Sequence, residues 1–168
     1  MYIRVILFFI LLILTPFITH AKDIQYNHNS MSVSEVNEKV VFSVLTPDQI
    51  PEDWTLEIKT YPSEETEHYS HFRLHYMNSN DTKLMVGIEQ SPRRLLYDDV
   101  RRSLNAEQID INESQGYFSK WGNSSDDKGE ITGGLLCWKQ EGTYIVMDST
   151  EIPKKLMIEI AKSMKVVK

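Results

Sequence analysis

The sequence has one cysteine among its 168 residues, and this scarcity excludes several classes of protein. A single thiol cannot form an internal disulfide, and it cannot supply the several thiolates used by structural zinc and iron–sulfur sites. Basic residues are also scarce: 18 lysines and arginines face 24 acidic residues, for a formal net charge of −6. Broad binding to nucleic acid needs a basic surplus, so we expect no nucleic-acid partner.

The sequence lacks the motifs of the common catalytic and ligand-binding sites as well. It contains no glycine-rich phosphate loop and no nucleophile elbow, and no pair of carboxylates is set apart for acid–base catalysis. Residues 123–130 are rich in oxygen donors but fail the calcium-loop pattern, because Lys128 stands where that pattern requires glycine. We therefore expect a protein that is not an enzyme and that holds no metal ion or cofactor.

One long hydrophobic run is present, and it lies at the N-terminus. Arg4 is followed by ten apolar residues, Pro16 ends a helix there, and Ala21 offers the small residue that signal peptidase requires. Residues 1–21 are therefore predicted to be a signal peptide cleaved after Ala21, which makes the protein secreted or cell-surface. The run is shorter than the roughly 20 residues of a membrane span, and an uncleaved N-terminal anchor is the alternative. The only cysteine, Cys137, is too distant to carry a lipid at that site.

The rest of the chain is predicted to form one domain. Residues 22–31 are polar without periodicity and are expected to be a flexible spacer, whereas residues 32–168 are long enough for a single α+β domain. β-branched residues favour an extended segment over 40–47. Alternation of apolar and polar residues, together with turn signals, predicts strands over 54–61, 69–77, 83–90, 109–112, 116–121, 131–140 and 143–149.

Helical spacing of apolar residues appears in three places. A short helix capped by Ser32 or Ser34 would carry Val33, Val36 and Val40 at helical spacing. A connecting helix over 93–104 would bury Leu96, Val100 and Leu104. A C-terminal helix, capped by Ser149 or Thr150, would carry Pro153 in its first turn. The expected fold is a curved antiparallel sheet of about six or seven strands with a short N-terminal helix, a connecting helix and a packed C-terminal helix.

The order of these segments resembles the domain of unknown function 4367 family. The resemblance rests on a run over 42–56 (FSVLTPDQIPEDWTL), on the later strands LHY (74–76), MVGIEQ (85–90), LCW (136–138) and YIV (144–146), and on the closing helix IEIAKSM (158–164). It covers roughly residues 32–166. The family occurs largely in exported or membrane-anchored proteins of Gram-positive bacteria and has no established catalytic residues, so the resemblance implies no site residue.

We expect Cys137, His71 and His75 to have structural roles. Cys137 lies between Leu136 and Trp138 in an apolar strand, where a lone cysteine packs as a small hydrophobe. His71 and His75 share a strand face, and four residues at about 3.3 Å each put them roughly 13 Å apart, too far to share a metal ion. We expect them to form a solvent-facing polar row.

The candidate binding feature is a cluster of four arginines in an acidic protein: Arg93, Arg94, Arg101 and Arg102. Guanidinium groups bind phosphates and carboxylates, so phospholipid headgroups, cell-wall polymers and acidic peptides would all suit the cluster. Asp98 can pair with Arg94 and Arg101 at helical spacing, as Asp99 can with Arg102. A salt-bridged surface helix is therefore the alternative interpretation.

These features together predict a non-catalytic exported domain that binds a protein, peptide or cell-envelope component. We expect an envelope or extracytoplasmic protein as partner, and a peripheral contact with membrane or cell wall is left open. One alternative, a regulatory or assembly factor of a Gram-positive envelope linked to stress or sporulation, rests on family context alone. Another is an unrecognised envelope hydrolase, which would need a deep pocket with converging ionisable groups.

Overall fold

The computed structural model describes residues 24–27, 30–121 and 132–168. The predicted signal peptide over 1–21 and the polar loop over 123–130 lie entirely outside these described residues. Within the described part of the chain, no helix is both long enough and apolar enough to span a bilayer.

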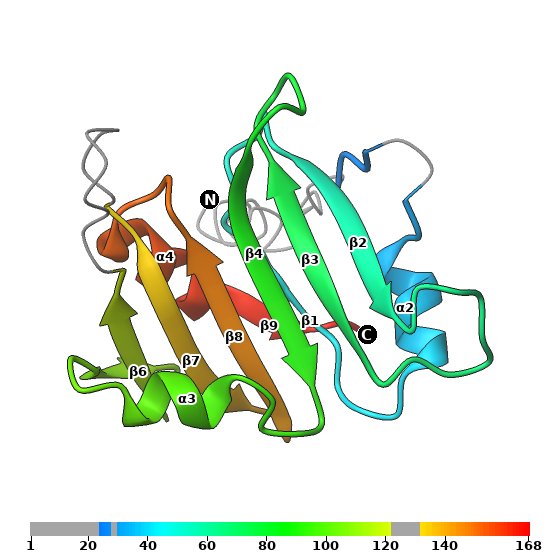
Figure 1. Cartoon of the computed structure of the whole chain (residues 1–168). Helices are drawn as coiled ribbons and strands as arrows, with labels where there is room; N and C mark the ends of the chain where they lie inside the picture. The colour runs from blue at the N-terminus through cyan, green and yellow to red at the C-terminus, as the bar shows by residue number, and fades with distance from the viewer. Residues whose placement is uncertain (1–23, 28–29, 122–131) are drawn as a thin grey trace, which may run out of the picture.

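Seven strands form one sheet in the order β2-β3-β4-β8-β7-β6-β5 (Figure 1). Every neighbouring pair is antiparallel. The strands are β2 (Thr55–Tyr61), β3 (His71–Met77), β4 (Leu84–Ser91), β5 (Glu107–Ile111), β6 (Ser114–Lys120), β7 (Gly134–Gln140) and β8 (Thr143–Ser149). The predicted α+β class and the predicted strand number are confirmed.

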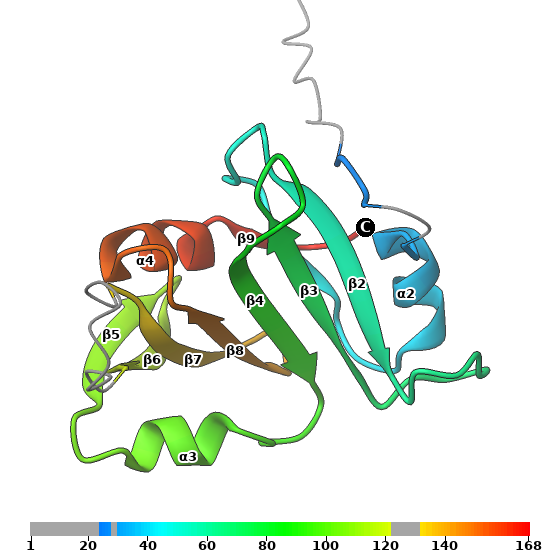
Figure 2. The same ribbon diagram turned by 45° about the horizontal axis from the view of Figure 1, so that its top comes forward.

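In the part of the chain that the structure describes, three helices accompany the sheet, as predicted: α2 (Val33–Lys39), α3 (Tyr97–Arg102) and α4 (Lys154–Lys162). Figure 2 shows α3 and α4 on opposite sides of strands β5 to β8. Buried residues of α2 and α4 belong to the main core, whereas Val100 of α3 belongs to a second, smaller cluster. We call the face of the sheet on the main core the inner face, and the other the outer face.

Strand alternation divides the residues between these two faces. In β3, Phe72, Leu74 and Tyr76 are buried on the inner face, whereas the residues between them are only partly buried. A bulge interrupts the pairing of β3 with β4, so that Tyr76 lies opposite Val86 but Met77 lies opposite Leu84. The extra residue shifts the pattern, and Met85 rather than Leu84 packs against the main core.

A second, two-stranded sheet joins β1 (Leu45–Pro47) to β9 (Met164–Val166). The extended segment expected over 40–47 is a strand only in its last three residues, and β9 was not predicted at all. The Gln90 side chain connects this ribbon to the large sheet: its amide oxygen accepts from the Leu45 nitrogen at 2.9 Å, and its amide nitrogen donates to the Leu45 oxygen at 2.7 Å. Gln90 is completely buried, and these bonds satisfy its polar atoms.

Helix α2 begins with a capping box, in which Ser32 and Glu35 each bond to the backbone of the other. The preceding segment, within the expected spacer, contacts the edge of the sheet. The nitrogen of Leu56 donates to the oxygen of Gln25, and the nitrogen of Asn27 donates to the oxygen of Leu56, both at 2.8 Å. Tyr26 is thereby held in a parallel bridge with β2.

The start of helix α4 differs from the prediction. Pro153 precedes the helix, and no side chain caps it. The Ser149 hydroxyl instead accepts from the nitrogens of Glu151 and Ile152 and donates to the oxygen of Met85. Four residues separate Ser149 from the first residue of the helix, so its hydroxyl does not reach the helix as a cap. It stabilises the turn before the helix instead and joins that turn to β4.

Candidate functional site

Helix α3 packs on the outer face of the sheet, over β6, β7 and β8. Its buried residue Val100 contacts a cluster with Cys137 and Val146, surrounded by Tyr97, Tyr117 and Leu135. The Ser103 and Ser119 hydroxyls bond at 3.0 Å just beyond the helix. These contacts fix the inward side of α3 and leave its other sides and both flanks to solvent.

The apolar stripe predicted for this helix is wrong in two of its three members. Val100 is buried, but Leu96 is 45% exposed and Leu104 is fully exposed. The reason is length: the helix has six residues, so Leu96 lies before it and Leu104 after it. Leu95, beside Leu96, is equally exposed. We call Leu95, Leu96 and Leu104 the leucine rim.

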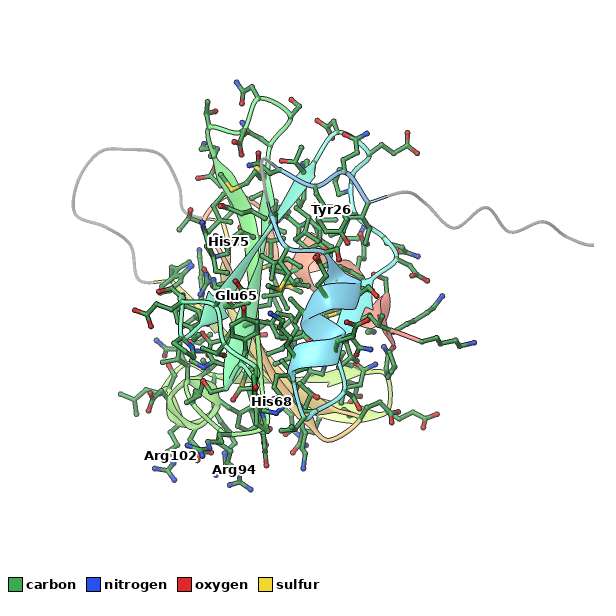
Figure 3. The ribbon with its side chains drawn as sticks, turned by 90° about the vertical axis from the view of Figure 1, so that its right-hand side faces the viewer. Tyr26, Glu65, His68, His75, Arg94 and Arg102 are labelled. Atoms are coloured by element: carbon green, nitrogen blue, oxygen red, sulfur yellow. The ribbon has the colours of Figure 1, made fainter. Side chains whose placement is uncertain are left out.

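All four predicted site arginines are exposed on α3 or its N-terminal flank. Figure 3 shows Arg94 and Arg102 extending from the same end of the molecule. We call Arg93, Arg94, Arg101 and Arg102 the arginine surface.

The predicted pairing with Asp98 is present. One carboxylate oxygen of Asp98 lies 4.0 Å from Nη1 of Arg94, and the other lies 3.6 Å from Nε of Arg101. Neither Arg93 nor Arg102 forms an ion pair with another residue that the structure describes. The arginine surface therefore has two partly neutralised members and two that are available to an external anion.

Tyr144 of β8 anchors the arginine surface to the sheet, a contact that sequence reasoning missed. The Arg94 Nε donates to the Tyr144 hydroxyl at 3.1 Å, and the guanidinium lies 5.6 Å from the ring centre. Lys139 lies 4.9 Å over the same ring, and Tyr97 meets its edge. The hydrogen bond from Arg94 lowers the pKa of Tyr144. No local signal could have found this contact, because 50 residues separate the two side chains.

Cys137 lies beneath α3, where its thiol donates to the Tyr97 oxygen at 3.6 Å. The residue is completely buried, and this burial raises the pKa of the thiol to about 12. A nucleophilic cysteine needs the opposite shift, so the structure supports the packing role expected from the sequence.

A polar row crosses the part of the outer face that α3 leaves uncovered. His71 and His75 flank Arg73 on β3, as predicted, and Figure 3 labels His75 on this face. Arg73 reaches over Gly87 to form an ion pair with Asp148 of β8. A β-carbon at position 87 would overlap the guanidinium, so the absence of a side chain at Gly87 leaves room for the ion pair. Arg73, at the centre of the row, is thus held by an ion pair that extends from β3 over β4 to β8.

The two histidines of the row have different surroundings. His71 stacks on Tyr61 with ring centres 4.4 Å apart. Burial, and then the neighbouring Arg73 charge, lowers the pKa of His75 to about 4. The part of the chain described by the structure contains no group of three or more His, Cys, Asp or Glu side chains that could hold a metal ion.

A hollow of about 620 Å³ lies elsewhere, between the segment after α2 and the end of β9. Its lining includes Val40, Val41, Val166 and Val167. Glu141 is its one ionisable side chain among the described residues. A catalytic pocket brings several ionisable groups together, and this hollow does not.

The fold and these surfaces define an α+β domain in which a seven-stranded antiparallel sheet carries helices on both faces. The sequence model described as "Domain of unknown function (DUF4367)" matches residues 44–164. The chain belongs to this family, because the match covers most of its length. No curated protein and no solved structure shows significant similarity to the chain.

Proposed function

We propose that the chain is a non-catalytic, exported domain that binds a protein, peptide or cell-envelope component through the arginine surface. The observation that carries the proposal is the local reversal of charge. Four of the 18 basic residues lie within residues 93–102 of a chain whose net charge is −6. All four are exposed, and the leucine rim lies among them. Exposed apolar residues beside unpaired charges are typical of contact surfaces.

Export is part of the same proposal. It is supported by the positive residue, the ten-residue apolar run and the small residue at position 21, in the order that a signal peptide requires. A protein delivered outside the membrane meets anionic polymers, lipids and proteins, all of which an arginine surface can bind.

The test is capture from the envelope of an exporting bacterial host, with variants that reverse charge at two places. Arg93→Glu/Arg102→Glu changes the arginine surface. Lys155→Glu/Lys168→Glu changes two exposed lysines elsewhere by the same net charge. We expect the first variant to lose envelope material that the wild type and the second variant retain. Equal retention by all three proteins would contradict the proposal.

A further inference from the structure

We infer that the envelope component recognised by this domain is the anionic phospholipid surface of a membrane, contacted by the arginine surface and the leucine rim together. The inference rests on the proposed function and names the chemistry of its partner. It makes the domain a peripheral membrane binder through α3 and its flanks.

The first argument comes from the leucine rim. Eight large hydrophobic residues are exposed in the described part of the chain, and three of them lie within residues 95–104. Leu104 is fully exposed, so it contributes no burial to the fold. Single exposed leucines need no explanation. Leucines before and after the same helix, both outside its packed side, form an apolar contact that lipid acyl chains can cover.

The second argument comes from the charges around those leucines. Residues 93–104 carry four arginines and two aspartates. Asp98 lies near Arg94 and Arg101, which leaves the guanidinium groups of Arg93 and Arg102 without an ion pair inside the described structure. Guanidinium groups bind phosphate oxygens in a bidentate manner, and basic side chains beside an apolar rim are the usual composition of interfacial segments.

The third argument concerns how the surface is held. Val100 packs against Cys137 and Val146, while Arg94 is bonded to Tyr144. The arginines are therefore presented by a helix fixed to the sheet and by the segment that precedes it, and Figure 3 shows two of them extending from one end of the molecule. The exposed leucines are close neighbours of these arginines in the sequence, so a bilayer in contact with the arginine surface meets charged and apolar side chains together. A cell-wall phosphate polymer would satisfy only the charges, and this difference favours the membrane.

The test measures sedimentation of the full chain with vesicles of phosphatidylglycerol and phosphatidylcholine, against vesicles of phosphatidylcholine alone. Every variant keeps residues 1–21, so that segment contributes equally throughout. We expect at least about tenfold tighter binding to the anionic vesicles, and a loss of at least about tenfold in Arg93→Glu/Arg102→Glu. Lys155→Glu/Lys168→Glu, with the same net charge, should stay within about threefold of the wild type. Equal binding to both vesicles, or equal loss in both variants, would overturn the inference.

Two further arms separate a membrane from a soluble phosphate ligand. Leu96→Ser/Leu104→Ser should weaken binding to anionic vesicles severalfold, whereas Val41→Ser, at another strongly exposed position, should not. Soluble glycerol phosphate should fail to displace the protein from the vesicles. Wild-type binding by the leucine variant together with complete displacement would identify a soluble phosphate instead and overturn the inference.

The outcomes also separate this inference from the proposed function. Thermal melting confirms that each variant is folded, and within the described residues Arg93 and Arg102 have no ion pair that their replacement would break. If vesicle binding fails but envelope capture still depends on these arginines, the partner is a polypeptide or polymer and only the lipid inference is wrong. If both fail, the arginine surface is not a binding surface.

Discussion

Tyr144 shows how one residue can organise a surface. Its hydroxyl accepts from Arg94, its ring lies under Lys139, and Tyr97 packs at its edge. An aromatic ring attracts cations through its face, and the hydroxyl adds a directed bond. The position of Arg94 is thus determined by a strand far away in the sequence, and the arginine surface is part of the folded domain rather than of a free loop.

At the same scale, Cys137 is predicted to be chemically inert. The thiol is completely buried, and its pKa is raised to about 12. Because thiolate is the reactive form, we expect alkylation at about pH 8 to be more than about a hundredfold slower in the folded protein than in urea. Mass spectrometry of the alkylated protein over time measures both rates. Similar rates in the two states would contradict the packing role.

His75 is predicted to make stability depend on pH. Its pKa is lowered to about 4 from an ordinary value of 6.5, so the unfolded chain takes up a proton before the folded one does. Protonation of His75 therefore costs no free energy of unfolding above about pH 6.5, and its cost increases as pH falls towards 4.

We expect this cost to reach about 1–2 kcal/mol, a value reduced because the ring is only partly buried. Urea unfolding of the wild type and of His75→Gln at about pH 7 and about pH 4.5 measures it. The variant should lose less stability on acidification; an identical loss in both proteins would show that His75 is not responsible.

At the scale of elements, the ribbon of β1 and β9 depends on Gln90. Its side chain bonds to both backbone groups of Leu45, which is completely buried. Gln90→Leu would leave those groups unsatisfied, so we expect a destabilisation of about 2–4 kcal/mol and faster amide exchange in β1. Gln108→Leu, on the exposed edge strand β5, should cost less than about 0.5 kcal/mol. Equal effects of the two changes in urea unfolding would refute this role.

The hairpins could be predicted from the sequence because their information is local. Alternation places Leu56 and Ile58 on one face, and it does the same for Phe72, Leu74 and Tyr76. Glu141 and Gly142 both adopt positive φ, 49° and 85°, as a two-residue hairpin turn favours. Each of these patterns depends on residues that are close together in the sequence, so the strands and the turn that they predict are found in the structure.

The remaining elements depend on contacts that no local pattern contains. β9 has three residues and pairs with a strand more than a hundred residues earlier, so neither its length nor its composition marks it. Helix α3 is shorter than its apolar spacing indicated, and Val100 is its one buried residue. One clue to the role of Gln90 lies in its position in the sequence. It follows Val86 and Ile88 in the alternation of β4 and therefore faces the core, where a polar side chain requires buried hydrogen-bond partners. The arginine surface was predictable in position, but its anchor on Tyr144 was not.

At the scale of the whole molecule, the charge distribution and the N-terminal segment determine the proposed place of action. We expect the protein recovered from an exporting bacterial host to begin at Lys22, because cleavage is predicted after Ala21. Mass spectrometry of the intact protein measures this directly. Recovery only from the cytoplasm, with residues 1–21 present, would contradict export. Recovery from the membrane with those residues intact would instead support the uncleaved anchor.

The most direct measurement of the proposed binding surface is photo-crosslinking in exporting cells. A photoreactive residue replaces Leu104, beside the arginine surface, or Val41, which is 82% exposed at another place on the molecule. Binding through the arginine surface predicts crosslinks to an envelope component from position 104, their loss in the Arg93→Glu/Arg102→Glu background, and none from position 41. Crosslinks of equal yield from both positions, or crosslinks from position 41 alone, would contradict it.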